Sequence, residues 1–147
     1  MTKQQYGLYS NMSVKKGEKQ DNTNKLILVC DDVRDNCFFL QTVLQMEGYE
    51  VDIVDSGAAT LAYLESTIPD LLLLDVMMPY MDGYEVARRI QNNPILQNLI
   101  ILFITAHEET FLNQQPDVKV RAVIRKPVEP DVLIEYVLAA LLQMHHL

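Results

Sequence analysis

Tryptophan is absent from the sequence, cysteine occurs only twice, and no hydrophobic run is long. Cys30 and Cys37 are spaced neither as a CxxC redox pair nor as a zinc site, and no multi-cysteine framework exists. This usage favours a reducing compartment. The longest apolar runs, such as residues 99–104, are far too short to span a bilayer, and no secretory signal pattern opens the chain. We therefore expect a cytoplasmic protein that does not enter the membrane.

Basic residues are scarce outside the first 24 positions. The chain has 12 Lys and Arg against 20 Asp and Glu, a net charge of −8. Four lysines, one Glu and one Asp lie in residues 1–24, so the rest of the chain has a net charge of −10. Such an acidic surface repels nucleic acid and anionic lipid. We expect neither as a direct partner.

The length and composition allow one folded domain. A chain of 147 residues that is 49% hydrophobic can bury one core of ordinary size. Residues 1–24 are polar, and their few apolar members follow neither helical nor strand periodicity. We predict a flexible N-terminal tail over residues 1–24 and a single domain over residues 25–147.

From Lys25 onward, short apolar runs alternate with segments of helical spacing. The runs are continuous, which is typical of strands that helices cover on both faces. Ser56 provides a helix start, Asp82-Gly83 makes a turn before another helix, and Gly48 provides a helix end. The predicted strands cover residues 26–30, 51–54, 71–74, 99–104 and 120–124, and the predicted helices cover residues 35–47, 56–64, 84–91 and 131–144, with at most two helical turns in residues 107–119. This repeated β-α rhythm predicts an α/β fold with a parallel sheet.

Several polar side chains are expected to meet at one edge of this sheet. Parallel strands joined by right-handed helical crossovers place their carboxyl ends on the same edge, where open α/β sheets bind ligands. The residues at those strand ends are Asp31, Asp32, Asp75, Thr105 and Lys126. Three carboxylates this close repel one another, and a bound cation relieves the repulsion. Because the donors are oxygen atoms alone, Mg²⁺ is favoured over zinc.

The same edge suits phosphoryl transfer to a carboxylate. That reaction mainly requires alignment and neutralisation of charge on the transferring group. A metal and Lys126 provide positive charge and the Thr105 hydroxyl provides a hydrogen bond, so that Asp75 could become an acyl phosphate. An isolated acidic pair such as Asp31-Asp32 would more often cap the following helix. The matching Asp75 and Lys126 favour the metal site instead.

The motifs at these strand ends resemble those of the receiver domains of two-component response regulators, from about Lys25 to the C-terminus. The matching runs are Val29-Cys30-Asp31-Asp32 with Asn36, Leu73-Leu74-Asp75-Val76-Met77-Met78-Pro79-Tyr80-Met81-Asp82-Gly83, Thr105-Ala106, and Lys126-Pro127. The resemblance implies a flavodoxin-like (CheY-like) fold, which is a doubly wound five-stranded parallel sheet in the strand order 2-1-3-4-5 with helices on both faces.

The resemblance implies a metal site around the phosphoacceptor. By this resemblance Asp75 is expected to be the phosphoacceptor and to ligate Mg²⁺ together with Asp32 and the Met77 backbone carbonyl. Asp31 reaches the metal mostly through water. We do not expect an enzyme that turns over an external substrate, because Met77 stands where a phosphatase would need a second carboxylate.

The resemblance also assigns the groups that hold the phosphoryl oxygens, and it has one departure. Thr105 and Lys126 bind the oxygens, and Pro127 follows a cis peptide that aims the lysine. The family usually has an aromatic residue three positions before that lysine, where this chain has Val123. Its usual Gly-Ala ahead of the aromatic is replaced by Lys119-Val120. Output through this region is therefore expected to differ from the common pattern.

The implied function is a phosphorylation switch. A sensor histidine kinase or histidine phosphotransfer protein provides the phosphoryl group, and phosphorylation shifts a conformational equilibrium that a downstream protein reads. No output domain follows the last predicted helix, so we expect a stand-alone receiver. The alternative is a phosphate sink, or a receiver-fold binding module whose output does not depend on phosphorylation. The last helix is apolar nearly all round, which favours a protein interface such as a homodimer.

Overall fold

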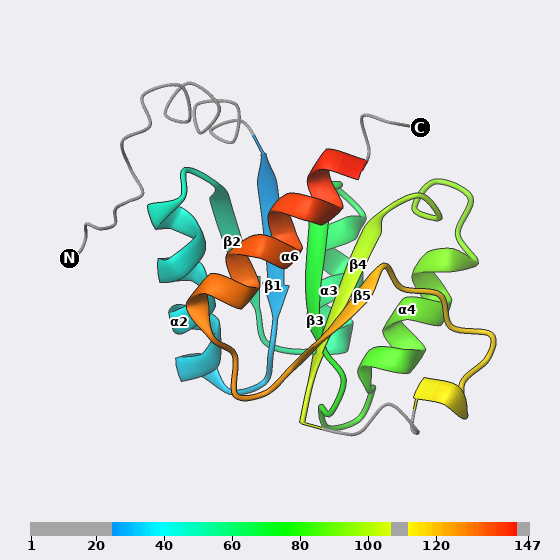
Figure 1. Ribbon diagram of the computed structural model, residues 1–147. Helices are drawn as coiled ribbons and strands as arrows, with labels where there is room; N and C mark the ends of the chain where they lie inside the picture. The colour runs from blue at the N-terminus through cyan, green and yellow to red at the C-terminus, as the bar shows by residue number, and fades with distance from the viewer. Residues whose placement is uncertain (1–24, 107–111, 144–147) are drawn as a thin grey trace.

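The computed structural model describes residues 25–106 and 112–143, so the predicted tail lies outside the described residues. A five-stranded parallel sheet has its strands in the order β2-β1-β3-β4-β5 (Figure 1). The elements are β1 (Leu26–Cys30), α2 (Arg34–Met46), β2 (Glu50–Val54), α3 (Gly57–Leu64), β3 (Leu71–Asp75), α4 (Gly83–Gln91), β4 (Ile100–Thr105), β5 (Ala122–Arg125) and α6 (Pro130–Gln143). The predicted fold class and strand order are confirmed.

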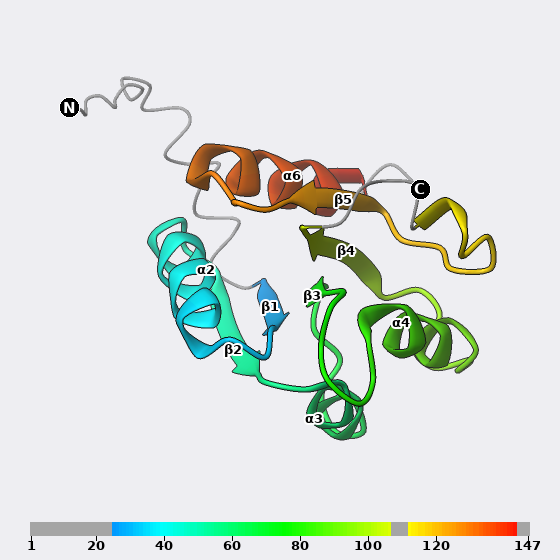
Figure 2. The same ribbon diagram turned by 90° about the horizontal axis from the view of Figure 1, so that it is seen from below.

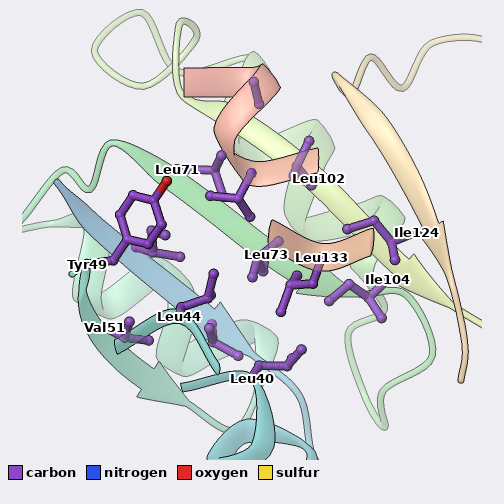
Figure 3. Close-up of a cluster of buried hydrophobic side chains, with 14 of the residues drawn as sticks. Leu40, Leu44, Tyr49, Val51, Leu71, Leu73, Leu102, Ile104, Ile124 and Leu133 are labelled. Carbon is purple, nitrogen blue, oxygen red and sulfur yellow. The ribbon is translucent and has the colours of Figure 1, made fainter. Parts of the chain in front are cut away.

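Helices cover both faces of the sheet. In Figures 1 and 2, α2 and α6 lie on one face and α3 and α4 lie on the other. Leu73 and Leu102 belong to the core under α2 and α6, which Figure 3 shows, whereas Leu72, Leu74 and Phe103 belong to the core under α3 and α4. Because both faces are covered, the central strands are apolar at successive positions, which explains the continuous runs in the sequence.

The predicted helix signals are confirmed. The Ser56 hydroxyl accepts a hydrogen bond from the Ala59 N–H at 3.0 Å, and the Asp82 carboxylate accepts one from the Glu85 N–H at 2.9 Å. Each cap satisfies a donor that helix geometry leaves unpaired. Gly48 has a φ of 99° after α2, in the left-handed region that side chains disfavour.

The largest shift of a strand is in β5, which was predicted over residues 120–124 and begins at Ala122. Val120 packs against the core under α3 and α4 before the strand starts, so its apolar character reflects burial rather than strand pairing. The Arg121 N–H then donates to the Ile101 carbonyl at 2.8 Å and guides the chain into the sheet.

The helix predicted within residues 107–119 lies partly outside the described residues, which leave out 107–111. The described remainder is helical only at its start. The Gln115 N–H closes a turn by donating to the Leu112 carbonyl at 2.8 Å, and Pro116 follows directly. Proline has no N–H to donate, so a helix cannot continue through this point at low cost.

Helix α6 buries one side and leaves apolar side chains on another. Leu133, Val137, Ala140 and Leu141 are buried. The exposed large side chains of this helix are Val132, Tyr136, Leu138 and Leu142. The predicted interface on this helix and the homodimer both stay predictions. None of the helices in the described part of the chain is long and apolar enough to cross a membrane.

Candidate functional site

The polar residues predicted to meet at the sheet edge do so. Asp31 and Asp32 directly follow β1, Asp75 ends β3, Thr105 ends β4, and Lys126 directly follows β5. These four strands are neighbours in the sheet. Asp31, Asp75 and Thr105 are buried, Lys126 is partly buried, and Asp32 is exposed. The site therefore has a buried floor and one carboxylate open to solvent.

Lys126, which follows β5, contacts residues at the ends of β1, β3 and β4. Its Nζ lies 3.1 Å from Asp75 Oδ1 and 3.2 Å from Asp31 Oδ2. Its backbone N–H donates to the Thr105 carbonyl at 2.9 Å. The peptide between Lys126 and Pro127 is cis, as the resemblance implied. The ammonium group is thus held between the two buried carboxylates.

The three carboxylates form one cluster. Each of Asp31, Asp32 and Asp75 offers an oxygen atom, and these atoms all lie within 4.8 Å of one another. Asp31 is held in place by the Val33 N–H at 2.9 Å and the Asn36 side-chain amide at 3.2 Å. The alternative in which the acidic pair caps the first helix is wrong, because Val33 is the N-cap of α2 and no side-chain cap hydrogen bond forms.

The site raises the pKa values of Asp75 and Lys126 for different reasons. Burial, and then the Asp31 carboxylate, raise the pKa of Asp75 from 3.8 to about 6, and the Lys126 ammonium only partly offsets this. Burial lowers the pKa of Lys126, but the Asp75 and Asp31 carboxylates raise it by more, so the net direction is upward. The lysine is therefore charged at neutral pH, while ionised Asp75 still experiences uncompensated negative charge.

These residues fit a hard divalent cation. The donor set consists of carboxylate oxygens alone, and the exposed Asp32 leaves one side open to water or to a phosphoryl oxygen. Mg²⁺ prefers such oxygens and keeps several waters. Met77 lies in the loop after Asp75, with 53% of its side chain exposed, and the role of its carbonyl as a ligand stays a prediction.

We expect Mg²⁺ to stabilise the protein more at neutral than at acidic pH. In the metal-free protein the pKa of folded Asp75, about 6, lies above the unfolded value of 3.8. The folded state binds this proton more tightly than the unfolded state does, and this stabilises the protein at low pH. The stabilisation is complete below about pH 4 and is lost as the pH rises through 6, which lowers the free energy of unfolding by roughly 3 kcal/mol. Mg²⁺ binds the ionised carboxylate, so it should restore stability above that pH and have little effect near pH 5. Urea unfolding with and without Mg²⁺ at both pH values measures this.

Asp75→Asn is the matched control, because asparagine keeps the shape and removes the titrating group. At neutral pH the metal-free variant should be more stable than the wild-type protein by up to about 3 kcal/mol. Mg²⁺ should stabilise the variant less than the wild type. An Mg²⁺ effect of equal size at both pH values would contradict the assignment of Asp75 as a ligand.

A cleft beside the cluster was not predicted from the sequence. It has a volume of about 550 Å³, and Phe39 of α2, Ile104 of β4 and Val128 line it next to Asp31. Its walls are mostly apolar. Asn36 and Phe39 are three residues apart on α2 and so share a helix face. That spacing could have indicated that Phe39 lies beside the acidic pair.

The departure at Val123 is visible in the packing. Val123 lies in β5, partly buried against the core under α3 and α4. The aromatic contact in that core joins other elements instead, since Tyr84 of α4 meets Phe103 of β4 edge-to-face with ring centroids 5.6 Å apart. An aromatic switch residue on β5 is therefore not available to this chain.

Residues 27–138 match the family model of the response regulator receiver domain. The chain belongs to this family. Among curated relatives of this receiver, the response regulator PleD of Caulobacter vibrioides is 41% identical over 80 residues, which are 54% of this chain but only 18% of PleD. The response regulator receiver protein CpdR of Brucella abortus is 39% identical over 104 residues, which are 70% of this chain and 85% of CpdR.

A solved structure has the same fold as this receiver. The CheY-like response regulator receiver domain protein of Methanospirillum hungatei JF-1 superposes with a TM-score of 0.77 at 26% identity. The match covers 83% of this chain and 97% of that one. The whole carboxylate and lysine cluster lies within the residues that match the family model, so the receiver domain contains the complete candidate site.

Proposed function

We propose that this receiver accepts a phosphoryl group on Asp75, with Mg²⁺ held by Asp31, Asp32 and Asp75. The observation that carries the proposal is the position of the Lys126 ammonium between the Asp75 and Asp31 carboxylates, at the edge where all three acids converge. An ammonium group and a carboxylate cluster so placed can receive a phosphoryl group between them.

The reaction is an in-line displacement at phosphorus. A carboxylate oxygen of ionised Asp75 forms a bond to phosphorus while the bond from phosphorus to the donor breaks. With a phosphohistidine donor, the electron pair of that bond stays on the imidazole nitrogen, and Asp75 becomes an acyl phosphate. Bound Mg²⁺ supplies positive charge beside the transferring group.

The chain's own residues hold the transferred group. The Lys126 ammonium, 3.1 Å from Asp75, neutralises charge on one phosphoryl oxygen, and the Thr105 hydroxyl at the end of β4 donates a hydrogen bond to another. Lysine suits this role because it is a compact point charge on a flexible stem. The Met77 carbonyl completes the metal ligands.

The proposed donor is a sensor histidine kinase or a histidine phosphotransfer protein. The cleft beside the site, with Phe39 and Val128 in its walls, offers apolar contact next to the reacting carboxylate. A downstream protein then reads the phosphorylated state. We propose no turnover of an external substrate, because the partly exposed Met77 provides no acid or base.

We further propose that residues 25–147 form the receiver and that it acts in the cytoplasm, where its two buried free thiols, Cys30 and Cys37, stay reduced. Val123 favours an output that differs from aromatic coupling through β5. A phosphate sink or a phosphorylation-independent binding module is the second candidate, and the same observation at Val123 supports it.

Intact-mass measurement after incubation with acetyl phosphate and Mg²⁺ tests the central proposal. We expect the wild-type protein to gain the mass of one phosphoryl group and Asp75→Ala to gain none. The matched control is Asp55→Ala, since Asp55 follows β2 at the same sheet edge but is exposed and outside the carboxylate cluster. It should be phosphorylated like the wild type.

An adduct that survives in Asp75→Ala would remove the assigned acceptor. Absence of an adduct in the wild type and in Asp55→Ala, in the presence of Mg²⁺ and a phosphodonor, would instead favour the phosphorylation-independent binding module.

A further inference from the structure

The loop between β3 and α4 presents an aromatic side chain close to Asp75 in the sequence. Tyr80 lies in this loop with its side chain fully exposed, and Met77 of the same loop is 53% exposed. Among the described residues, Tyr80 makes no side-chain hydrogen bond or ring contact. Exposed tyrosine and methionine beside a reactive site are typical of contact surfaces, where these residue types are enriched.

The backbone at Tyr80 has a conformation that favours glycine. Its φ is 69°, and the Met81 N–H donates to the Pro79 carbonyl at 2.7 Å, which closes a three-residue γ-turn around Tyr80. A γ-turn of this hand is rare and strained for a residue with a side chain. Within the described part of the chain, no hydrogen bond or ring contact of the Tyr80 side chain offsets that strain. Strain kept at a functional site is a reason to ask what the residue does there.

Hydrogen bonds fix this loop at its far end. The Gly83 N–H donates to the Val76 carbonyl at 2.7 Å, and Asp82 caps α4. The backbone that carries the Tyr80 ring therefore has little conformational freedom. A side chain presented in this way loses little conformational entropy when it is covered, so it is well suited to bind a partner.

We propose that Tyr80 is a specificity-determining contact for the protein that brings the phosphoryl group to Asp75, and that its ring packs against an apolar side chain of that donor. The inference rests on the proposed function. The donor is the expected occupant because the short loop that carries Tyr80 begins directly after Asp75, so a protein that places a phosphohistidine against Asp75 approaches this loop. A small phosphodonor does not extend to it. Tyr80 thus acts on docking and takes no part in the chemistry.

Phosphorylation of Tyr80→Gly by two donors tests the proposal. With acetyl phosphate and Mg²⁺, the rate should stay within about twofold of the wild type. With a histidine phosphotransfer protein phosphorylated on its histidine, KM should rise by about tenfold while kcat changes little. Tyr80→Phe, which keeps the ring, should behave like the wild type with both donors. Glycine relaxes the turn, so Tyr80→Gly should unfold at no lower temperature than the wild type.

The control variant is Ile95→Ala, which removes an exposed apolar side chain beyond the far end of α4. It should leave both reactions unchanged. Equal KM values for the protein donor in Tyr80→Gly and the wild type would overturn the inference, as would an equal loss with both donors. A wild-type protein that neither donor phosphorylates would overturn the proposed function instead.

Discussion

Replacing Lys126 with alanine should slow phosphorylation of Asp75 by about a hundredfold or more. The Lys126 ammonium lies 3.1 Å from Asp75 Oδ1, where negative charge collects on the phosphoryl oxygens during transfer. No other lysine or arginine of the described residues forms an ion pair with the carboxylate cluster. The initial rate of phosphorylation by acetyl phosphate at saturating Mg²⁺, followed by intact mass, measures the effect.

The matched control is Arg125→Ala. Arg125 directly precedes Lys126, is exposed, and forms no ion pair with the carboxylate cluster. Its rate should equal that of the wild type. Mg²⁺ should bind Lys126→Ala at least as tightly as the wild type, since the variant removes a competing positive charge near Asp75. A Lys126→Ala protein that phosphorylates at the wild-type rate would show that the ammonium has no part in the transfer.

The place of the site could be predicted from the sequence because topology alone determines it. Once the β-α rhythm indicates a parallel sheet, every residue that directly follows a strand is brought to one edge, whatever the packing inside. Asp75 and Lys126 are far apart in the sequence, and they meet because β3 and β5 run in the same direction with only β4 between them. The residue types also favour Mg²⁺ as the proposed ligand, since it prefers oxygen donors.

The contacts within the site could not be predicted in this way. Strand order does not say which carboxylates a flexible lysine will reach, and Lys126 pairs with Asp31 as well as Asp75. The raised pKa of Asp75 depends on the burial of its side chain, which the position of a residue at a strand end leaves open. The cleft at Phe39 depends on how α2 packs against β4, and a single helix pattern does not contain that information.

Gly83 is a residue that sequence reasoning placed correctly but for an incomplete reason. The sequence predicts a turn at Asp82-Gly83 before the helix. In the structure Gly83 begins α4, and a Cβ atom built on it would lie 2.7 Å from the Asp75 carbonyl oxygen and 2.8 Å from the Val76 Cα. The need for glycine therefore comes from the close approach of the helix start to the backbone of Asp75 and Val76.

Gly83→Ala should lower the free energy of unfolding by about 2–3 kcal/mol. Both atoms that the new methyl group would meet belong to the backbone, so relief requires α4 to move away from β3. That movement would also weaken the hydrogen bond from the Gly83 N–H to the Val76 carbonyl, which is 2.7 Å long. Urea unfolding monitored by circular dichroism measures the loss. Because the new methyl group would press against the Asp75 carbonyl, we expect Mg²⁺ to restore less stability to this variant than to the wild type.

Gly57→Ala separates this clash from the general effect of alanine in a helix. Gly57 is likewise the first residue of a helix, so the change in helix propensity is the same at both positions. A Cβ atom at Gly57 would meet the side chains of Val86 at 2.8 Å and Met81 at 3.0 Å, and side chains can rotate where backbone cannot. Gly57→Ala should therefore cost at least about 1 kcal/mol less than Gly83→Ala. Equal losses in the two variants would mean that α4 is free to shift, and that its contact with the Asp75 backbone does not fix the position of Asp75.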